Sequence, residues 1–292
     1  MAIEIKNKRI SISADASQIS DFMKCPRLWY YKYIKSIEPT EKRIDEDLSM
    51  NKGTLVHALL DYYYKANPTD LMRSANECLT KFSMETPKLD VSSKDQQFIM
   101  QRFLQYVGNY SKFGEFQPLR INGVPQVEVG FSNTILDTDQ YHFVLEGRID
   151  LITDKEVFVD HKTQSKKYNY YHYNPQFLTY SLATGLSSGC INYISLAAKT
   201  DEETFRRYPF IVTIEMRDRW KEKVIKIFKR MAGCIVNNEF EMNENSCQGN
   251  FGICKYTQLC ETIDPNIQKR LINFKFKERE KWEPWRLSEN GS

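Results

Sequence analysis

The sequence predicts a mixed α/β fold, and three observations support this prediction. In the first 120 residues, apolar side chains recur every three or four positions, which is typical of helices. After residue 120, apolar and polar side chains alternate, which is typical of strands. The 292 residues are 41% hydrophobic and 13% aromatic, which is ample for a packed core. We therefore expect a helical part over residues 1–120, an α/β core over 121–240 and a cysteine-bearing C-terminal element over 241–292.

The helical part should contain four helices. Ser17 is a candidate N-cap for the first helix, and Pro26 interrupts or restarts it. The stretch NKGTLVHALLDYYYKANP repeats apolar residues at helical spacing and stops before Pro68. Two more helices are expected over residues 69–85 and 92–112.

The core should begin with three strands, in VPQVEVGFSNTI, YHFVLEGRIDLIT and EVFVDHKT, because these stretches are rich in Val, Ile, Phe and Tyr and are separated by turn residues. Asn174 and Pro175 form an N-cap and first-turn pair for a helix that ends near residue 185. Two further strands are expected in CINYISLAAK and TFRRYPFIVTIE. A long amphipathic helix follows, with apolar residues at three- or four-residue spacing from Met216 to Ile235.

Hydropathy and charge exclude some classes of protein. The longest apolar runs are far shorter than the roughly 20 residues that a membrane helix needs, and MAIEIKNKRISIS lacks the apolar core of a signal peptide. We therefore expect a cytoplasmic protein with no membrane partner. A net charge of +3 is too small to predict nucleic-acid binding by itself, although basic residues cluster in KTQSKK, FRRY and RDRWKEKVIKIFKR. The chain contains no GxxxxGK[ST] motif and hence no P-loop motor of its own.

Two aspartates and a lysine stand near the ends of neighbouring predicted strands. Asp160 and Lys162 project to the same side of one strand, and Asp150 closes the strand before it. If the two strands pair as a hairpin, the carboxylates can share a divalent cation such as Mg²⁺ or Mn²⁺. Lys162 would then lie where an ammonium group stabilises the charge that develops during phosphodiester hydrolysis. The alternative is three solvated charges at strand ends.

The cysteines form a second pattern. Three of the seven crowd into CQGNFGICKYTQLC, at Cys247, Cys254 and Cys260. In a chain without a secretion signal, such crowding favours metal or cluster ligation over disulfide bonds. The other four are Cys25, Cys78, Cys190 and Cys234. The last three of these lie in apolar surroundings, where packing is the expected role.

Four short motifs occur in a set order along the chain. They are GTLVH with Gly53 and His57, GRID with Asp150, VDHKT with Asp160 and Lys162, and QFLTY with Gln176 and Tyr180. Together they resemble the PD-(D/E)XK nuclease superfamily, specifically its RecB-like branch, over about residues 13–262. The resemblance implies a restriction-endonuclease-like fold, with a mixed central sheet flanked by helices, and the activity of a deoxyribonuclease that depends on Mg²⁺ or Mn²⁺.

The resemblance also implies roles for individual residues. It makes His57, Asp150 and Asp160 the metal ligands, the main-chain carbonyl of His161 a further ligand, and Lys162 the catalytic lysine. The chain has aspartate at position 160, where glutamate is commoner, and the family pattern tolerates this departure. Without the resemblance, a lone histidine among leucines is more often a hydrogen-bonded core residue than a ligand.

Three further residues are candidates for the site. Gln176 and Tyr180 are four residues apart on one helix face, where they can orient Lys162 or contact a phosphate together. Packing is the alternative for Tyr180. Glu128 is a candidate additional metal ligand, and a solvent-facing strand position is its alternative.

The cysteine pattern fits the same branch. Several members, among them CRISPR spacer-acquisition nucleases and AddB-type recombination nucleases, tie the N-terminal helix to the C-terminus through a [4Fe-4S] cluster held by one early and three late cysteines. The corresponding residues are Cys25, Cys247, Cys254 and Cys260, and Cys247 departs from the usual CxxC spacing, which would place a ligand at Phe251. Four thiolates also suit zinc, and unligated cysteines are the remaining alternative.

The expected function is that of a DNA nuclease, acting as an exonuclease or on single strands, in recombination, repair or CRISPR adaptation. Its expected partners are DNA and a helicase, recombinase or CRISPR-adaptation protein, in a prokaryotic cell or a phage-infected host. The stretch KKYNYYHYN interleaves tyrosines with basic residues and is a candidate for stacking on exposed bases, although surface or core tyrosines produce the same composition. The rival function is a catalytically silent DNA-end-binding or scaffold subunit.

Overall fold

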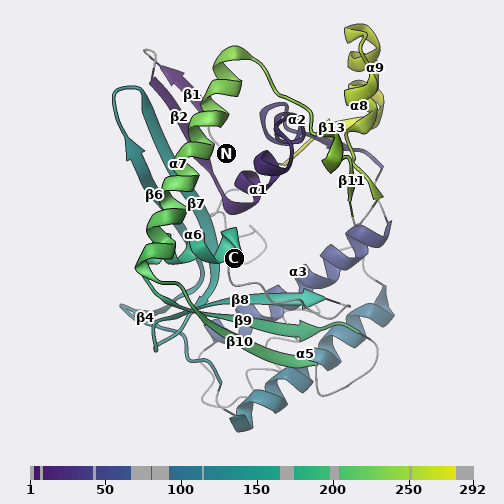
Figure 1. The fold of residues 1–292 in the computed structure, drawn as a ribbon. Helices are drawn as coiled ribbons and strands as arrows, with labels where there is room; N and C mark the ends of the chain where they lie inside the picture. Colours follow the sequence, from purple (N-terminus) through teal and green to yellow (C-terminus); the bar gives the residue numbers. More distant parts are fainter. Residues whose placement is uncertain are drawn as a thin grey trace. The chain divides into compact units, whose positions relative to one another are not determined.

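The computed structural model describes residues 3–6, 9–41, 44–66, 80, 92–113, 115–164, 174–197, 204–249 and 252–280. The chain divides into two compact units, each assembled from segments that are distant in the sequence (Figure 1). Unit 1 comprises Met1–Arg43, Phe131–Gly147 and Glu215–Arg286, and unit 2 comprises Ile44–Gly130, Arg148–Ile214 and Leu287–Ser292. The boundary crosses two long strands, which therefore contribute to both units.

The main sheet is mixed. Its strands are β1 (Ile3–Lys6), β2 (Arg9–Ala14), β6 (Val127–Asp137), β7 (Tyr141–Ile152), β8 (Val157–Gln164), β9 (Ser188–Ser195) and β10 (Phe205–Ile211). The hydrogen-bonded order is β1-β2-β7-β8-β9-β10, and β6 also pairs with β7. The pairs β2–β7 and β8–β9 are parallel, whereas β1–β2, β7–β8 and β9–β10 are antiparallel. This sheet and its flanking helices confirm the predicted α/β class and the restriction-endonuclease-like architecture.

The helices of unit 1 come from its N-terminal and C-terminal segments. They are α1 (Ala16–Lys24), α2 (Pro26–Trp29), a π-helical turn (Tyr30–Ile34), α7 (Ile214–Asn237), α8 (Thr257–Glu261) and α9 (Pro265–Lys275). Helix α7 packs on the first half of β7, where the rings of Phe143 and Phe228 meet edge to face with centroids 5.3 Å apart. The apolar residues of α7 that repeat every three or four positions, such as Val224, Phe228 and Met231, are buried as the sequence pattern predicts.

Small elements connect the N-terminal and C-terminal segments of unit 1. Strand β3 (Ile37–Pro39) pairs antiparallel with β13 (Phe276–Glu278), although more than 230 residues separate them. Tyr31, Tyr256 and Leu259 form the buried cluster beside this pair. A 3₁₀ turn (Glu244–Ser246) and the short strands β11 (Gln248–Gly249) and β12 (Gly252–Ile253) lie between α7 and α8 in the chain.

Unit 2 is organised around two long helices and the second half of the sheet. The helices are α3 (Ile44–Lys65) and α5 (Ser93–Phe113), and the short strands β4 (Arg120–Ile121) and β5 (Val124–Pro125) form a separate hairpin. Leu59, Ile99 and Phe103 of the two helices pack in one buried cluster with Leu151 and Val159 of the sheet. Helix α6 (Pro175–Thr184) begins after Asn174, whose side chain accepts a hydrogen bond from Gln176 N–H, as the N-cap prediction requires.

Some local predictions are wrong or cannot be compared. The N-cap of α1 is Asp15, not Ser17, because the Asp15 carboxylate accepts the hydrogen bond from Gln18 N–H. The first 14 residues contain β1 and β2, which the reading of this part as mostly helical misses. The helix expected over residues 69–85 lies outside the described residues, apart from Thr80. None of the described helices combines the length and apolarity needed to cross a membrane.

Candidate active site

The pairing of β7 with β8 places two of the expected carboxylates side by side. Leu151 lies opposite Val159, and Ile152 opposite Phe158, in an antiparallel register. Asp150 and Asp160 follow these two pairs directly along the strands, and burial and the charge of Asp160 both raise the pKa of Asp150. This pairing is the hairpin on which the predicted metal site depends.

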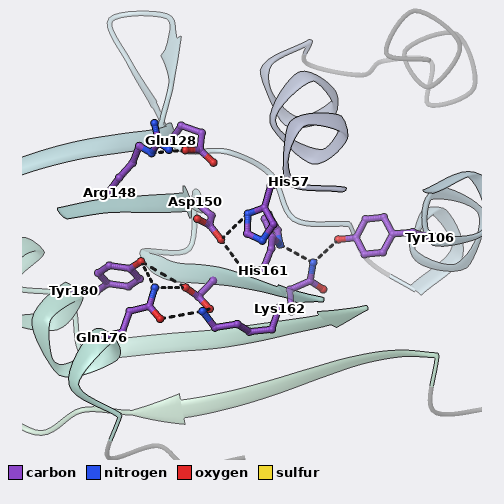
Figure 2. A network of polar contacts seen from close by, with 11 residues as sticks. His57, Tyr106, Glu128, Arg148, Asp150, His161, Lys162, Gln176 and Tyr180 are labelled. Atoms are coloured by element: carbon purple, nitrogen blue, oxygen red, sulfur yellow. Dashed lines mark hydrogen bonds and ion pairs between the residues drawn. The ribbon is translucent and has the colours of Figure 1, made fainter. Parts of the chain in front are cut away.

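A group of three possible metal ligands lies at this point of unit 2. One ligand atom each from His57, Glu128 and Asp150 lies within 4.8 Å of the others (Figure 2). His57 Nδ1 is 3.6 Å from Asp150 Oδ2, and the same carboxylate oxygen accepts a 2.7 Å hydrogen bond from His161 N–H. All three residues are among the ligands that the sequence predicts, with Glu128 as an additional one.

A close approach of α3 to β8 brings His57 to the sheet. Gly53 lies one helical turn before His57, and a Cβ added at Gly53 would lie 3.0 Å from Thr163 Oγ1. Any larger residue at this position would have to move that threonine or the helix. The glycine of the GTLVH motif therefore serves the packing that positions the histidine.

Asp160 lies outside this group and faces a lysine instead. Its side chain is 2% exposed, and its Oδ2 is 2.8 Å from Lys162 Nζ. Gln176 bridges the pair, because its Oε1 accepts from Lys162 Nζ at 2.9 Å and its Nε2 donates to Asp160 Oδ1 at 2.9 Å. The same Nε2 lies 2.7 Å from the Tyr180 hydroxyl (Figure 2). Gln176 thus contacts Lys162 directly, whereas Tyr180 contacts Gln176, and their joint role in orienting Lys162 or contacting a phosphate stays a prediction.

The His161 side chain points to the other side of β8, into a buried polar network. Its ring stacks on Tyr64, with centroids 5.7 Å apart and planes 6° from parallel. Asn192 lies opposite His161 in the parallel pairing of β8 with β9, and its Nδ2 is 2.8 Å from His161 Nδ1. Asn192 Nδ2 also donates to the Tyr106 hydroxyl at 3.0 Å, and the Tyr106 and Tyr64 hydroxyls are 2.6 Å apart. Tyr64 donates onward to Glu115 at 2.8 Å.

No pattern in the sequence predicts this network. Its members come from α3, α5, β8 and β9, which are far apart in the sequence, so no local spacing connects them. The alternation of β8 indicates only that His161 faces away from Asp160 and Lys162. The main-chain carbonyl of His161 stays a prediction as a metal ligand.

Burial shapes the charges of the site. Burial raises the pKa of Asp150 to about 7, and the charge of Asp160 adds to this effect. Burial also raises the pKa of Glu128 to about 7, and the charge of Asp150 contributes. The pKa of His57 is lowered by its burial, which favours the neutral imidazole that a metal requires.

The three side chains suit a divalent cation by their chemistry. Glu128 and Asp150 offer carboxylate oxygens, which Mg²⁺ and Mn²⁺ prefer, and His57 offers an imidazole nitrogen. Both carboxylates are half-buried and have raised pKa values, and a bound cation would favour their charged forms. The group therefore fits the divalent cation that the sequence predicts, and Asp160 as a ligand stays a prediction.

The four cysteines expected to act together line one pocket in unit 1. Cys25 is the extended residue between α1 and α2, and its Sγ accepts a 3.4 Å hydrogen bond from Asn243 N–H. Cys247, Cys254 and Cys260 complete the thiol lining of the pocket, and all four are free of disulfide bonds. Burial raises the pKa of the Cys260 thiol to about 11, and the neighbouring Cys254 contributes.

Comparison with known proteins assigns the family. The family model of the PD-(D/E)XK nuclease superfamily matches residues 13–261, and the chain belongs to this superfamily. No curated protein matches the chain. Among solved structures, the chain is similar to "Putative exonuclease" from Eubacterium rectale, with 14% identity and a TM-score of 0.49, over 82% of this chain and 86% of that one. It is also similar to LHK-Exo in complex with dAMP, with 11% identity and a TM-score of 0.34, over 67% of this chain and 96% of that one.

We predict that metal binding strengthens as the pH rises toward about 7. Asp150 and Glu128 hold protons below that pH, and a cation must displace them, so the apparent affinity should rise about tenfold per pH unit for each proton displaced. Because both pKa values lie above those of the unfolded chain, the metal-free protein should lose stability as the pH rises from about 4 through about 7. Calorimetric titration with Mn²⁺ and melting in EDTA at several pH values measure both effects. An Asp150→Asn variant should weaken both dependences, and identical profiles in that variant would contradict the prediction.

We also predict that the Tyr106 hydroxyl affects activity through His161. Tyr106→Phe removes the acceptor of Asn192 Nδ2 and should cost about 1–3 kcal/mol of stability. It should also slow cleavage at saturating metal, because Asn192, which contacts the His161 ring, is then no longer held in place by Tyr106. Tyr63→Phe is the matched control, since the Tyr63 hydroxyl bonds Glu115 at the far end of the network. Equal cleavage rates in the two variants would show that the network is structural only.

Proposed function

We propose that this member of the nuclease superfamily is a metal-dependent deoxyribonuclease that acts from DNA ends or on single strands. The observation that carries the proposal is the arrangement of Lys162 between Asp160 and Gln176, next to the possible ligands His57 and Asp150. Recombination, repair or CRISPR adaptation are the processes in which such an enzyme would act, with a helicase, recombinase or adaptation protein as its partner.

The residues of the chain have distinct roles in this proposal. His57, Glu128 and Asp150 would hold Mg²⁺ or Mn²⁺, and the cation would acidify water and neutralise charge on the phosphate. Lys162 presents its ammonium group to the attacking water or to a phosphate oxygen. Asp160 and Gln176 hold that ammonium in place through the two contacts at 2.8 and 2.9 Å. A scaffold that only binds DNA ends would have no use for this buried arrangement.

We further propose that the cysteine pocket holds a [4Fe-4S] cluster, with zinc as the alternative. Four thiols from both ends of unit 1 line one pocket, which supports a shared ligand. Either metal would favour the thiolate form, and in that way offset the burial that raises the pKa of Cys260.

Replacing Lys162 with alanine tests the nuclease proposal. Loss of the ammonium group should reduce cleavage by about 100-fold or more, by analogy with the removal of one charge-stabilising donor. Lys155→Ala is the matched control, because Lys155 is an exposed lysine in the turn between β7 and β8. The assay uses end-labelled single- and double-stranded DNA, with open and blocked ends, in Mg²⁺ or Mn²⁺. Cleavage by Lys162→Ala at the wild-type rate would refute the proposed role.

Removing one pocket cysteine tests the proposed cluster. Protein purified without oxygen should be brown, with broad absorbance near about 400 nm from iron–sulfur charge transfer. Cys254→Ala should bleach the colour and lower the melting temperature, whereas Cys234→Ala, a cysteine outside the pocket, should do neither. If metal analysis finds one zinc per chain and no iron, the four cysteines share a zinc site instead of a cluster. If neither metal is found and Cys254→Ala melts like the wild type, the cluster proposal fails.

A further inference from the structure

Arg148 has a position that the proposed chemistry does not use. It lies two residues before Asp150 on β7, so both side chains project from the same face of the strand. Arg148 Nε is 2.6 Å from Glu128 Oε2 (Figure 2). The Arg148 side chain is 29% exposed, against 15% for Glu128, so a ligand in solution can reach part of it.

The contact with Glu128 occupies one edge of the guanidinium group. Within the described part of the chain, Glu128 is the one residue that forms an ion pair with Arg148. A guanidinium carries five N–H donors in a planar fork, and the end of the fork matches two oxygens of a phosphate. Nε is engaged, and the two Nη groups at the end of the fork are the part that a ligand would meet.

The acidic charges of the site mean that an anionic ligand needs a cation close to where it binds. Glu128, Asp150 and Asp160 are all acidic, and a nucleic acid that approaches them needs nearby cations to offset the repulsion. Lys162 is already held by Asp160 and Gln176. Among the residues of Figure 2, Arg148 is therefore a second cation, besides Lys162, that could meet a phosphate.

The backbone conformation of Glu128 is unusual for a strand residue. Glu128 has a φ of 53°, a left-handed conformation that is uncommon for a residue other than glycine within a strand. This kink in β6 turns the carboxylate so that it reaches both Arg148 and the group of His57 and Asp150. One carboxylate thus joins the possible metal site to the arginine.

We propose that Arg148 binds a backbone phosphate of the DNA substrate, next to the phosphate that is cleaved. Two residues along a strand span about 7 Å, so the phosphate at Arg148 is a neighbour of the one at Asp150. Glu128 acts as the positioning residue that holds the guanidinium. This inference rests on the proposed function, because it assumes that the substrate is a nucleic acid.

The test measures DNA binding in a Lys162→Ala background, where cleavage does not interfere. Fluorescence anisotropy with a labelled single-stranded oligonucleotide in Mg²⁺ measures affinity between about 50 and 200 mM salt. Adding Arg148→Ala should weaken binding about tenfold and lower the salt slope by about 0.7, the value for one phosphate contact on a single strand. Adding Arg120→Ala, which removes an exposed arginine of the β4–β5 hairpin, should leave the slope unchanged. Arg148→Lys should restore the slope and only part of the affinity, because it retains the charge without the fork.

Calorimetric titration with Mn²⁺ separates a phosphate contact from an effect on the metal site. Arg148→Ala should still bind Mn²⁺. An unchanged DNA affinity and slope in Arg148→Ala would overturn the inference, and so would a loss of DNA binding that merely follows a loss of Mn²⁺ binding. If Arg148→Ala does not fold, Arg148→Lys in the Lys162→Ala background replaces it. A DNA affinity below that of Lys162→Ala alone then supports the inference, and an equal affinity overturns it. If the wild type cleaves no DNA but binds it through Arg148, the nuclease proposal fails and the phosphate site stands.

Discussion

The antiparallel pairing of β7 with β8 is the interaction on which the candidate active site depends. Leu151 and Val159, which face each other across this pair, are fully buried and anchor the hairpin in the core of unit 2. A slip of one residue would move every side chain of β8 to the opposite face and so would separate Val159 from Leu151. The register of a hydrophobic pair therefore keeps Asp160 and Lys162 on the same side as Asp150, and the site inherits its geometry from the core.

The site balances buried negative charge with two separate cations. Asp160 is almost fully buried, and Lys162 offsets the desolvation of its carboxylate. Arg148 has the same relation to Glu128. Asp150 lies between the two pairs without a cation of its own among the contacts described above, and its pKa is raised to about 7 accordingly. The balance of charge is thus least complete at the carboxylate where a divalent cation would be most favourable, which relates the electrostatics of the folded chain to metal binding.

The sequence predicts the parts of this site that local spacing encodes. The two-residue separation of Asp160 and Lys162, and the N-cap that begins α6 just before Gln176, are patterns within short segments, and the structure brings these side chains together. Asn192 and Arg148 could not be predicted in this way. The contact of Asn192 with His161 depends on the pairing of β8 with β9, and the contact of Arg148 with Glu128 depends on the kink in β6. Non-local pairing and a single left-handed residue leave no periodic signal. The strands β1 and β2 did have such a signal, in the alternating isoleucines of IEIKNKRISIS, and the helical reading of the first half overlooked it.

The cysteine pocket concerns how the N-terminal and C-terminal segments of unit 1 are held together. Unit 1 is assembled from three segments, and Cys25 precedes Cys247 by about 220 residues. Closing so long a loop costs conformational entropy, although the cost grows only slowly with length. Backbone pairing of β3 with β13 and the cluster around Tyr31 already close this loop. A metal or cluster bound to the four thiols would add its binding free energy to a connection that exists without it, because a ligand that binds only the folded state stabilises that state. Loss of the ligand should therefore weaken unit 1 by a finite amount and leave its β3–β13 pairing in place.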